Sequence, residues 1–552
     1  MKVKQITVPC LSILLLCVAS CRQPHSDLES GVDEIFKRFN SGTPGCVVAV
    51  VDHGKVVLQK GYGMANLEYD VPITPSSIFD IASVSKQFAG LAISTLIQEG
   101  KISLDDDVRK YLPDVPDFGK SITIRHLVNH TSGLRDWPEG LHFAGWRWDE
   151  VFSFQDIVRM VNHQKELDFA PGERFSYSNT GYNLLARIVE KVTGAPFREW
   201  TDKNIFEPLG MEHSHFLDDH NLVIKNMAYS YSGAEKGYRK NPNSLTAYGS
   251  SSLFTNVEDL SKWVIHFNEM LAANDPVYTR MLETGVLNSG EKTDYAFGLA
   301  VEKSGGLRMV SHTGGWAGYR TIIMNFPDEK LSIIVLGNIG EFNSEDEALQ
   351  VAKLILKEKY QDPPNGPDAV KKMPDVTLDP ELAKKFVGIY QLGRRWFVTL
   401  TLEDGKLMTQ ANGEEKFLMV PKSDSVVWIE AYGSPMTFVM DQNGEVNMIR
   451  YHGINAKRIT PLQADAAQLK QFAGLYYSEE LETEYRLTFE DNKLTLHHMR
   501  LGDFDLHSSI VMKDAADGAI GSLQFTRDKG KVSGFLLSGG RVQNIRFDRR
   551  GD

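Results

Sequence analysis

One serine and one lysine in the segment "FDIASVSKQFAG" have the spacing that nucleophilic catalysis uses. Ser83 and Lys86 open an apolar run that continues to about Glu99, where Gly100 is a favoured helix terminator. In a helix, residues three apart lie on one face, and a lysine among apolar side chains loses proton affinity. The pattern therefore predicts Ser83 as a nucleophile and Lys86 as its base. The alternative is a serine that caps the helix and a lysine that extends to solvent.

The same Ser-x-x-Lys spacing occurs again at Ser289 and Lys292. These residues lie in "LNSGEKTD", a polar turn that contains glycine, so no predicted helix holds them in a fixed geometry. Ser85 lies between Ser83 and Lys86 in sequence, but its helical position should point it away from them. The predicted helix, more than the spacing itself, therefore favours Ser83.

A second segment, "FSYSNTGYNLL", places Tyr177 and Asn179 where a loop enters another apolar helix pattern. A phenol can take part in proton transfer, and an amide can hold both a donor and an acceptor. Taken separately, the two residues are more simply interpreted as a packing aromatic and a helix cap.

A third segment, "MVSHTGGWAG", places His312, Thr313, Gly314 and Gly315 at the end of a β-type run. The glycine pair allows a ligand to approach the backbone closely. The alternative is an ordinary turn at the end of a strand.

The elements around these segments predict an α+β fold. β-type runs occur near the start of the chain ("CVVAVVDHGKVVLQKGYG") and again after about residue 290, with helical patterns between them. We therefore expect the first and last runs to share one antiparallel sheet, flanked by helices and carrying a helical subdomain, within residues 21–360. Residues 361–379 are rich in Pro, Gly and Asp and are predicted to be a linker.

The C-terminal third contains an internal repeat. "FVGIY" at Phe386 recurs as "FAGLY" at Phe472, "EDGKL" at Glu403 as "EDNKL" at Glu490, and "DQNGEV" later as "DKGKV", all at a nearly constant interval. Landmarks in one order at one period predict two copies of a small antiparallel β module, of the lipocalin-like barrel type, at residues 380–463 and 464–552. A single larger barrel is the alternative.

The N-terminus predicts export. Lys2 and Lys4 precede a short apolar stretch that ends at "LCVASC", so residues 1–20 form a signal peptide pattern. The final cysteine resembles the lipobox of bacterial lipoproteins, which makes Cys21 the expected site of lipidation; the alternative is a secretory signal with an incidental cysteine. Cys46 then has no disulfide partner and is expected in the core.

Composition excludes one class of partner. The formal net charge is −12, and no basic stripe is evident, so a nucleic-acid partner is not expected. We identify no metal site and expect no cofactor.

The three motifs, in the order Ser-x-x-Lys, Tyr-x-Asn and His-Thr-Gly, resemble those of the penicillin-recognising serine hydrolases. This superfamily contains serine β-lactamases, D,D-peptidases, D-aminopeptidases and esterases with a β-lactamase fold. The resemblance covers roughly residues 27–360 and includes "LVNHTSGL" and "SSLFTNVEDLSKW".

The resemblance implies a role for each predicted residue. Ser83 attacks a carbonyl and is acylated, Lys86 and Tyr177 share the acid–base work, and Asn179 binds Lys86 and the substrate amide. Backbone N–H groups of Ser83 and Gly315 form the oxyanion hole, and water then hydrolyses the acyl-enzyme.

One position departs from most of the superfamily. β-Lactamases and D,D-peptidases mostly carry lysine where this chain has His312, and histidine is mostly neutral at pH 7. The sequence is more similar to the D-aminopeptidase and esterase branches, in which the D-aminopeptidase-like enzymes resemble this layout of a hydrolase followed by two β modules. Recognition of a substrate carboxylate could move to Arg320.

We therefore expect an exported, lipid-anchored serine hydrolase of the bacterial cell envelope, in the periplasm or at the cell surface. It is expected to cleave small peptide amides or esters through an acyl-serine intermediate. The alternatives are a β-lactamase or D,D-peptidase that acts on cell-wall peptides, and a non-catalytic lipoprotein that binds peptidoglycan.

Overall fold

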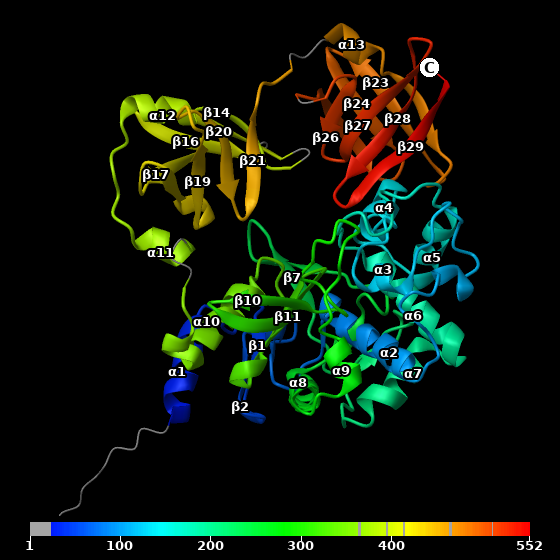
Figure 1. The fold of residues 1–552 in the computed structure, drawn as a ribbon, viewed down its shortest axis with the longest axis vertical. Helices are drawn as coiled ribbons and strands as arrows, with labels where there is room; N and C mark the ends of the chain where they lie inside the picture. Colours follow the sequence, from blue (N-terminus) through cyan, green and yellow to red (C-terminus); the bar gives the residue numbers. More distant parts are fainter. Residues whose placement is uncertain are drawn as a thin grey trace, which may run out of the picture.

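The protein consists of an N-terminal unit, a linker and two β-barrels (Figure 1). The computed structural model describes residues 24–551 except 363–365, 394–395, 412–413, 463–465 and 511. The predicted signal peptide and Cys21 lie outside the described residues.

A six-stranded antiparallel sheet forms the centre of the N-terminal unit, in the order β10-β11-β12-β13-β1-β2. β1 pairs with β13 from Cys46 opposite Gly337 to Asp52 opposite Leu331, so the first and last parts of this unit share one sheet, as predicted. The strands are β1 (Cys46–Asp52), β2 (Lys55–Tyr62), β10 (Ala300–Ser304), β11 (Leu307–Trp316), β12 (Tyr319–Phe326) and β13 (Leu331–Gly337).

Helices cover both faces of this sheet. Alternate side chains of β1 pack into two different cores, one on each face. Cys46, Val48 and Val50 pack in the cluster that contains residues of α1 (Pro24–Phe36) and α10 (Ser344–Leu356). The intervening residues, such as Val47, pack in the large cluster under α2 (Lys86–Gln98) and α8 (Val257–Ala272). Because both faces are covered, β1 is apolar and buried from Cys46 to Val51.

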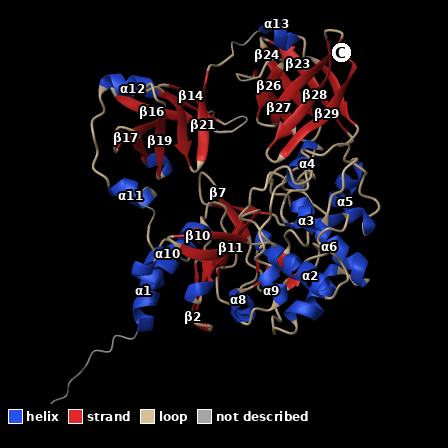
Figure 2. Cartoon of the chain, viewed as in Figure 1, coloured by secondary structure: helices blue, strands red, loops and turns tan. Residues whose placement is uncertain are grey.

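A helical subdomain and three short sheets complete this unit (Figure 2). The helices are α3 (Ile124–Val128), α4 (Trp137–Phe143), α5 (Phe154–His163), α6 (Asn179–Thr193), α7 (Phe197–Thr201) and α9 (Pro276–Arg280). The short strands are β3 (Met64–Asn66), β4 (Val71–Pro72), β5 (Phe79–Asp80), β6 (His215–Phe216), β7 (Ser230–Gly233), β8 (Tyr238–Asn241) and β9 (Leu253–Thr255).

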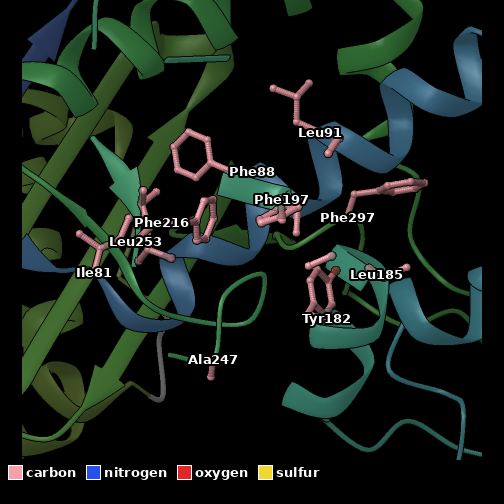
Figure 3. Packing of buried hydrophobic residues seen from close by; sticks show 14 of the residues in the cluster. Ile81, Phe88, Leu91, Tyr182, Leu185, Phe197, Phe216, Ala247, Leu253 and Phe297 are labelled. Carbon is pink, nitrogen blue, oxygen red and sulfur yellow. The ribbon is translucent and has the colours of Figure 1, made fainter. Parts of the chain in front are cut away.

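Helix α2 lies in the centre of the largest core. Phe88, Leu91 and their neighbours are buried among side chains from α6, α7 and β9, several of which Figure 3 shows around the helix. Gly90 lies close to another segment, because a Cβ atom there would lie 2.3 Å from the carbonyl oxygen of Phe297. The residues that begin α2 are therefore held firmly in place.

The two C-terminal modules are separate closed barrels of eight antiparallel strands each, so the prediction of two modules is confirmed and the single larger barrel is wrong. The first contains β14 (Gly388–Gln391), β15 (Phe397–Glu403), β16 (Lys406–Ala411), β17 (Phe417–Pro421), β18 (Val426–Ile429), β19 (Ser434–Met440), β20 (Val446–Tyr451) and β21 (Ile454–Ile459). The second contains β22 (Gly474–Ser478), β23 (Thr483–Glu490), β24 (Lys493–His498), β25 (Gly502–Ser508), β26 (Ala515–Gly518), β27 (Gly521–Asp528), β28 (Lys531–Gly539) and β29 (Val542–Gly551).

Short helices accompany the linker and the barrels. The predicted linker contains α11 (Pro367–Lys372), which the Pro- and Gly-rich composition did not indicate. α12 (Pro380–Phe386) precedes the first barrel, and α13 (Ala466–Lys470) precedes the second. None of the helices in the described ranges is both long and apolar enough to cross a membrane.

Candidate active site

Ser83 lies in a strained turn directly before α2. Residues Ala82–Ser85 form a 3-10 turn rather than the first turn of the predicted α-helix, and Ala82 has a φ of 48°. Such a left-handed conformation is costly for alanine and is maintained only where neighbours fix it. Here the Ala82 backbone N–H donates to the Asp80 carboxylate at 2.8 Å. The turn ends where α2 begins at Lys86, and it leaves the Ser83 hydroxyl 3.0 Å from the Lys86 amine.

Lys86 has no exposed surface and three oxygen neighbours. Its Nζ lies 3.0 Å from Ser83 Oγ, 2.7 Å from Asn179 Oδ1 and 2.7 Å from the Ser250 carbonyl oxygen. The two carbonyl-type oxygens can only accept, so they take the two N–H groups of a neutral amine. The amine lone pair is then left for the Ser83 hydroxyl. Burial lowers the pKa of Lys86 well below its usual range, which favours this neutral state.

Asp136 fixes the orientation of Asn179. The Asp136 carboxylate accepts the Asn179 backbone N–H at 2.6 Å and the Asn179 side-chain N–H at 3.1 Å. The amide oxygen of Asn179 must therefore face Lys86. Burial raises the pKa of Asp136, and the positive charge of Arg541 opposes that rise.

Tyr177 lies beside the nucleophile and its base. Its hydroxyl is within hydrogen-bonding reach of Ser83, and its ring centre lies 4.8 Å from Lys86 Nζ. The His130 ring packs on Tyr177 with centroids 4.3 Å apart, and His130 Nδ1 accepts the Ser178 backbone N–H. Burial raises the pKa of Tyr177, so the phenol stays protonated and can donate a proton to a leaving group.

His312 is buried and engaged on both ring nitrogens. Nδ1 lies 2.6 Å from the Thr313 carbonyl oxygen, and Nε2 lies 2.8 Å from the Tyr295 hydroxyl. Because the carbonyl can only accept, Nδ1 carries the proton and Nε2 accepts from Tyr295. Burial lowers the pKa of His312 to about 3. His312 is therefore neutral and is not a cation for a substrate carboxylate.

The segment after His312 forms an open edge beside Ser83. β10 pairs with β11 from Leu307 to Ser311, and β11 continues beyond this pairing to Trp316. Thr313 and Gly315 are exposed, whereas Gly314 is buried. A Cβ atom on Gly314 would lie 2.2 Å from the Ile81 carbonyl oxygen, so only glycine lets β11 lie this close to the turn that carries Ser83.

Other candidates from the sequence have local roles. Ser289 and Lys292 are exposed, and Ser289 Oγ accepts the Glu291 backbone N–H. Ser85 is buried, and its Oγ accepts the Leu253 backbone N–H instead of facing Lys86. Arg320 donates to the carbonyl oxygens of Ala317 and Tyr319.

Sequence reasoning missed several groups of the site. His130 lies within the segment "LVNHTSGL" and Asp136 follows it by two residues, so that segment was a usable signal. Ser250 contributes only a carbonyl oxygen, and Tyr295 and Arg541 have no motif around them. Within the described ranges, no group of three or more His, Cys, Asp or Glu side chains is placed to hold a metal ion.

Comparisons with known proteins agree with this geometry. The Beta-lactamase family model matches residues 32–356. A penicillin-binding protein of Bacillus subtilis (strain 168) is 30% identical over 425 residues, which cover 73% of this chain and 92% of that protein. A D-aminopeptidase of Brucella anthropi is 27% identical over 465 residues and covers 84% of both chains.

A solved structure resembles almost the entire chain. The octameric penicillin-binding protein homologue from Pyrococcus abyssi has a TM-score of 0.56 and 25% sequence identity, and the match covers 87% of this chain and 99% of that chain. The family model covers more than half of the sequence, and the order of the motifs is that of the superfamily. The chain therefore belongs to the beta-lactamase family and is a serine hydrolase of the beta-lactamase and D-aminopeptidase type.

Proposed function

We propose that the protein cleaves small peptide amides or esters through an acyl-Ser83 intermediate. The observation that carries the proposal is the environment of Lys86, whose two N–H groups face obligate acceptors while Ser83 occupies the third position. The Ser83 proton passes to Lys86 as Oγ attacks the carbonyl carbon. The bond to the leaving group then breaks with a proton from Tyr177 or Lys86, and water releases the acyl group from Ser83.

The neutral state of His312 favours the proposal of amide or ester substrates over substrates whose carboxylate needs a cation at this position. A neutral His312, with both nitrogens engaged, offers no positive charge to a substrate carboxylate. Relatives named D-aminopeptidase agree with this preference. The second candidate is hydrolysis of β-lactams or of D-Ala-D-Ala peptides, which the similarity to the Bacillus penicillin-binding protein favours.

The experiment is active-site labelling with a fluorophosphonate, followed by mapping of the adduct. We expect the label on Ser83, and we expect Ser83→Ala to lose labelling and to lower turnover by at least about a thousandfold. Ser289→Ala is the matched control because Ser289 belongs to the other Ser-x-x-Lys sequence, and it should label normally. Labelling that survives Ser83→Ala would refute the proposal.

A substrate panel separates the two candidates. D-amino acid amides and p-nitrophenyl esters represent the first, and nitrocefin and a D-Ala-D-Ala peptide represent the second. Turnover of the first pair well above the second supports the proposal, and the opposite ranking supports the alternative.

We further propose that the protein is exported and anchored by a lipid on Cys21. The proposal rests on the leader with Lys2 and Lys4 and on the segment "LCVASC". Several acyl chains on one cysteine would bind a bilayer firmly. Cys21→Ser should move the protein from the membrane fraction to the soluble fraction, and an unchanged membrane fraction would contradict the proposal.

A further inference from the structure

The second barrel meets the N-terminal unit at two consecutive residues of opposite charge. The buried Arg135 guanidinium pairs with Glu480 of the barrel and with Asp168, and it donates to the Gln543 carbonyl oxygen. The next residue, Asp136, pairs with Arg541 of the barrel. Unpaired charges are costly when buried, so a shifted or rotated barrel would remove Glu480 from Arg135 and Arg541 from Asp136 at a cost in free energy.

Arg541 lies at the tip of the hairpin between β28 and β29. Gly540, the residue before it, has a φ of +53°, and a Cβ atom there would lie 2.7 Å from Glu139 Oε1. A left-handed φ and this close approach both favour glycine where the turn lies against α4. The hairpin is held at a distance that brings the Arg541 side chain to the catalytic residues.

The Arg541 guanidinium contacts both Asp136 and Tyr177. Nε lies 2.9 Å from Asp136 Oδ2, and Cζ lies 5.3 Å from the centre of the Tyr177 ring. Nη2 lies 3.7 Å from Glu139 Oε1. Nε is buried and has no hydrogen-bond acceptor in line, so charge attraction holds the group in place.

This arrangement bears directly on the protonation of Lys86. Asp136 contacts Asn179, which in turn accepts from Lys86, and a lone negative charge there would favour the ammonium form of Lys86. Arg541 offsets that charge. Lys86 and Arg541 also contact the same Tyr177 ring, and two cations at one ring repel each other. Both effects favour the neutral amine.

The other groups that face Lys86 do not replace Arg541. Burial lowers the pKa of both His130 and His312, so neither adds a positive charge. Tyr182, whose ring lies 5.7 Å from Lys86 Nζ, stays protonated because burial raises its pKa. Glu139 also faces Arg541, but burial raises its pKa to about 7, so it becomes a second carboxylate only above that pH. Arg541 is thus the permanent positive charge that balances the acidic side of the site.

We propose that Arg541 is a positioning residue that the second barrel supplies to the hydrolase site, where it neutralises Asp136 and keeps Lys86 available as the base for Ser83. The proposal rests on the acyl-Ser83 chemistry proposed above. It makes the second barrel part of the catalytic apparatus, although the Ser83, Tyr177 and His312 motifs all lie in the N-terminal unit.

The test is the rate of fluorophosphonate labelling at Ser83 as a function of pH, in the full-length chain. Labelling requires neutral Lys86, so the rate rises through the Lys86 pKa. We expect Arg541→Gln to move this midpoint to higher pH by about one unit, because Asp136 is left unbalanced. Arg541→Lys keeps the charge and should restore the midpoint. The double variant Arg541→Gln/Asp136→Asn removes both charges and should also restore it.

Arg500→Gln is the control for weakened docking. Arg500 pairs with Glu150 across the same interface, away from the catalytic residues, and its loss should leave the midpoint of the labelling profile unchanged.

The outcomes separate a charge effect from a structural one. If Arg541→Gln lowers the maximal labelling rate but leaves the midpoint unmoved, Arg541 has a merely structural role and the proposal is overturned. An equal shift in Arg500→Gln would overturn it as well. Absence of labelling in the wild type would refute the proposed function together with this inference, whereas a labelled wild type with an unmoved midpoint refutes this inference alone. If Arg541→Gln does not fold, Arg541→Lys still tests the proposal, because a labelling midpoint that shifts although the positive charge is kept would overturn it.

Discussion

The two barrels share one internal design. In the first, the Phe386 and Phe438 rings stack with centroids 3.7 Å apart; in the second, the Phe472 and Phe525 rings do the same. In each, the tyrosine four residues after that first phenylalanine donates to the phenylalanine carbonyl oxygen. The repeated "FVGIY" and "FAGLY" segments thus encode the same core contacts.

The surfaces of the two barrels differ. The second barrel includes Phe143 of the N-terminal unit in its own apolar cluster, and it carries Glu480 and Arg541 to the catalytic side. The first barrel directs Lys422 to Asp375 and to the Met373 carbonyl oxygen, which belong to the linker. A duplicated fold therefore does not carry a duplicated role, because the role depends on side chains placed on the surface.

Among variants that compare the two barrels, loss of the buried pair between Glu480 and Arg135 should lower stability the most. Glu480→Ala leaves Arg135 buried with only part of its negative partners, and we expect the free energy of unfolding to fall by about 3 kcal/mol. Denaturation followed by tryptophan fluorescence measures this. Lys422→Ala, the matched change in the first barrel, should cost about 1 kcal/mol or less and leave activity intact, because Asp375 is largely exposed. Equal effects of the two variants would remove the distinction between the barrels.

The interface with the second barrel should also make stability depend on pH, whereas an exposed carboxylate of the first barrel should not. Burial, and then the Asp136 charge, raise the pKa of Glu139 from 4.5 to about 7. Between these values the folded state binds the proton more tightly than the unfolded state, so stability falls as pH rises, by a total on the order of 3 kcal/mol. Glu139→Gln should match the wild type at pH 4.5 and exceed it at pH 8. Glu445→Gln, at an exposed carboxylate of the first barrel, should retain the wild-type decline. A Glu139→Gln profile parallel to the wild type would contradict the assignment.

Removal of one tyrosine hydroxyl hydrogen bond should have the smallest effect on stability. The Tyr485 hydroxyl donates to the Phe143 carbonyl oxygen across the interface at 2.9 Å, whereas the Tyr390 hydroxyl donates within the first barrel. Each Tyr→Phe change should cost about 1 kcal/mol. Hydrogen exchange should become faster in α4 for Tyr485→Phe and remain unchanged there for Tyr390→Phe. Faster exchange in α4 for both would argue that the barrels are coupled as one unit.

Much of the fold could be predicted from the sequence because its signals are local. Alternating apolar runs indicated the shared sheet, and the repeat indicated two β modules, which the barrels confirm. The structure also brings Ser83, Lys86, Tyr177 and Asn179 together, as their motifs implied. The start of α2 was wrong by one turn, since residues Ala82–Ser85 form a 3-10 turn that a periodic apolar pattern does not distinguish from an α-helix.

The sequence by itself determined which serine and lysine could act together, because the apolar helix pattern after Ser83 and Lys86 predicts a fixed geometry that the polar turn at Ser289 and Lys292 does not. Tertiary structure alone decided that Lys86 is surrounded by Asn179 and Ser250, that His312 is neutral, and that Arg541 meets Asp136. These outcomes depend on burial and on contacts between residues far apart in the chain. The charge state of a side chain follows from the neighbours that folding places around it, and no local pattern in the sequence records those neighbours.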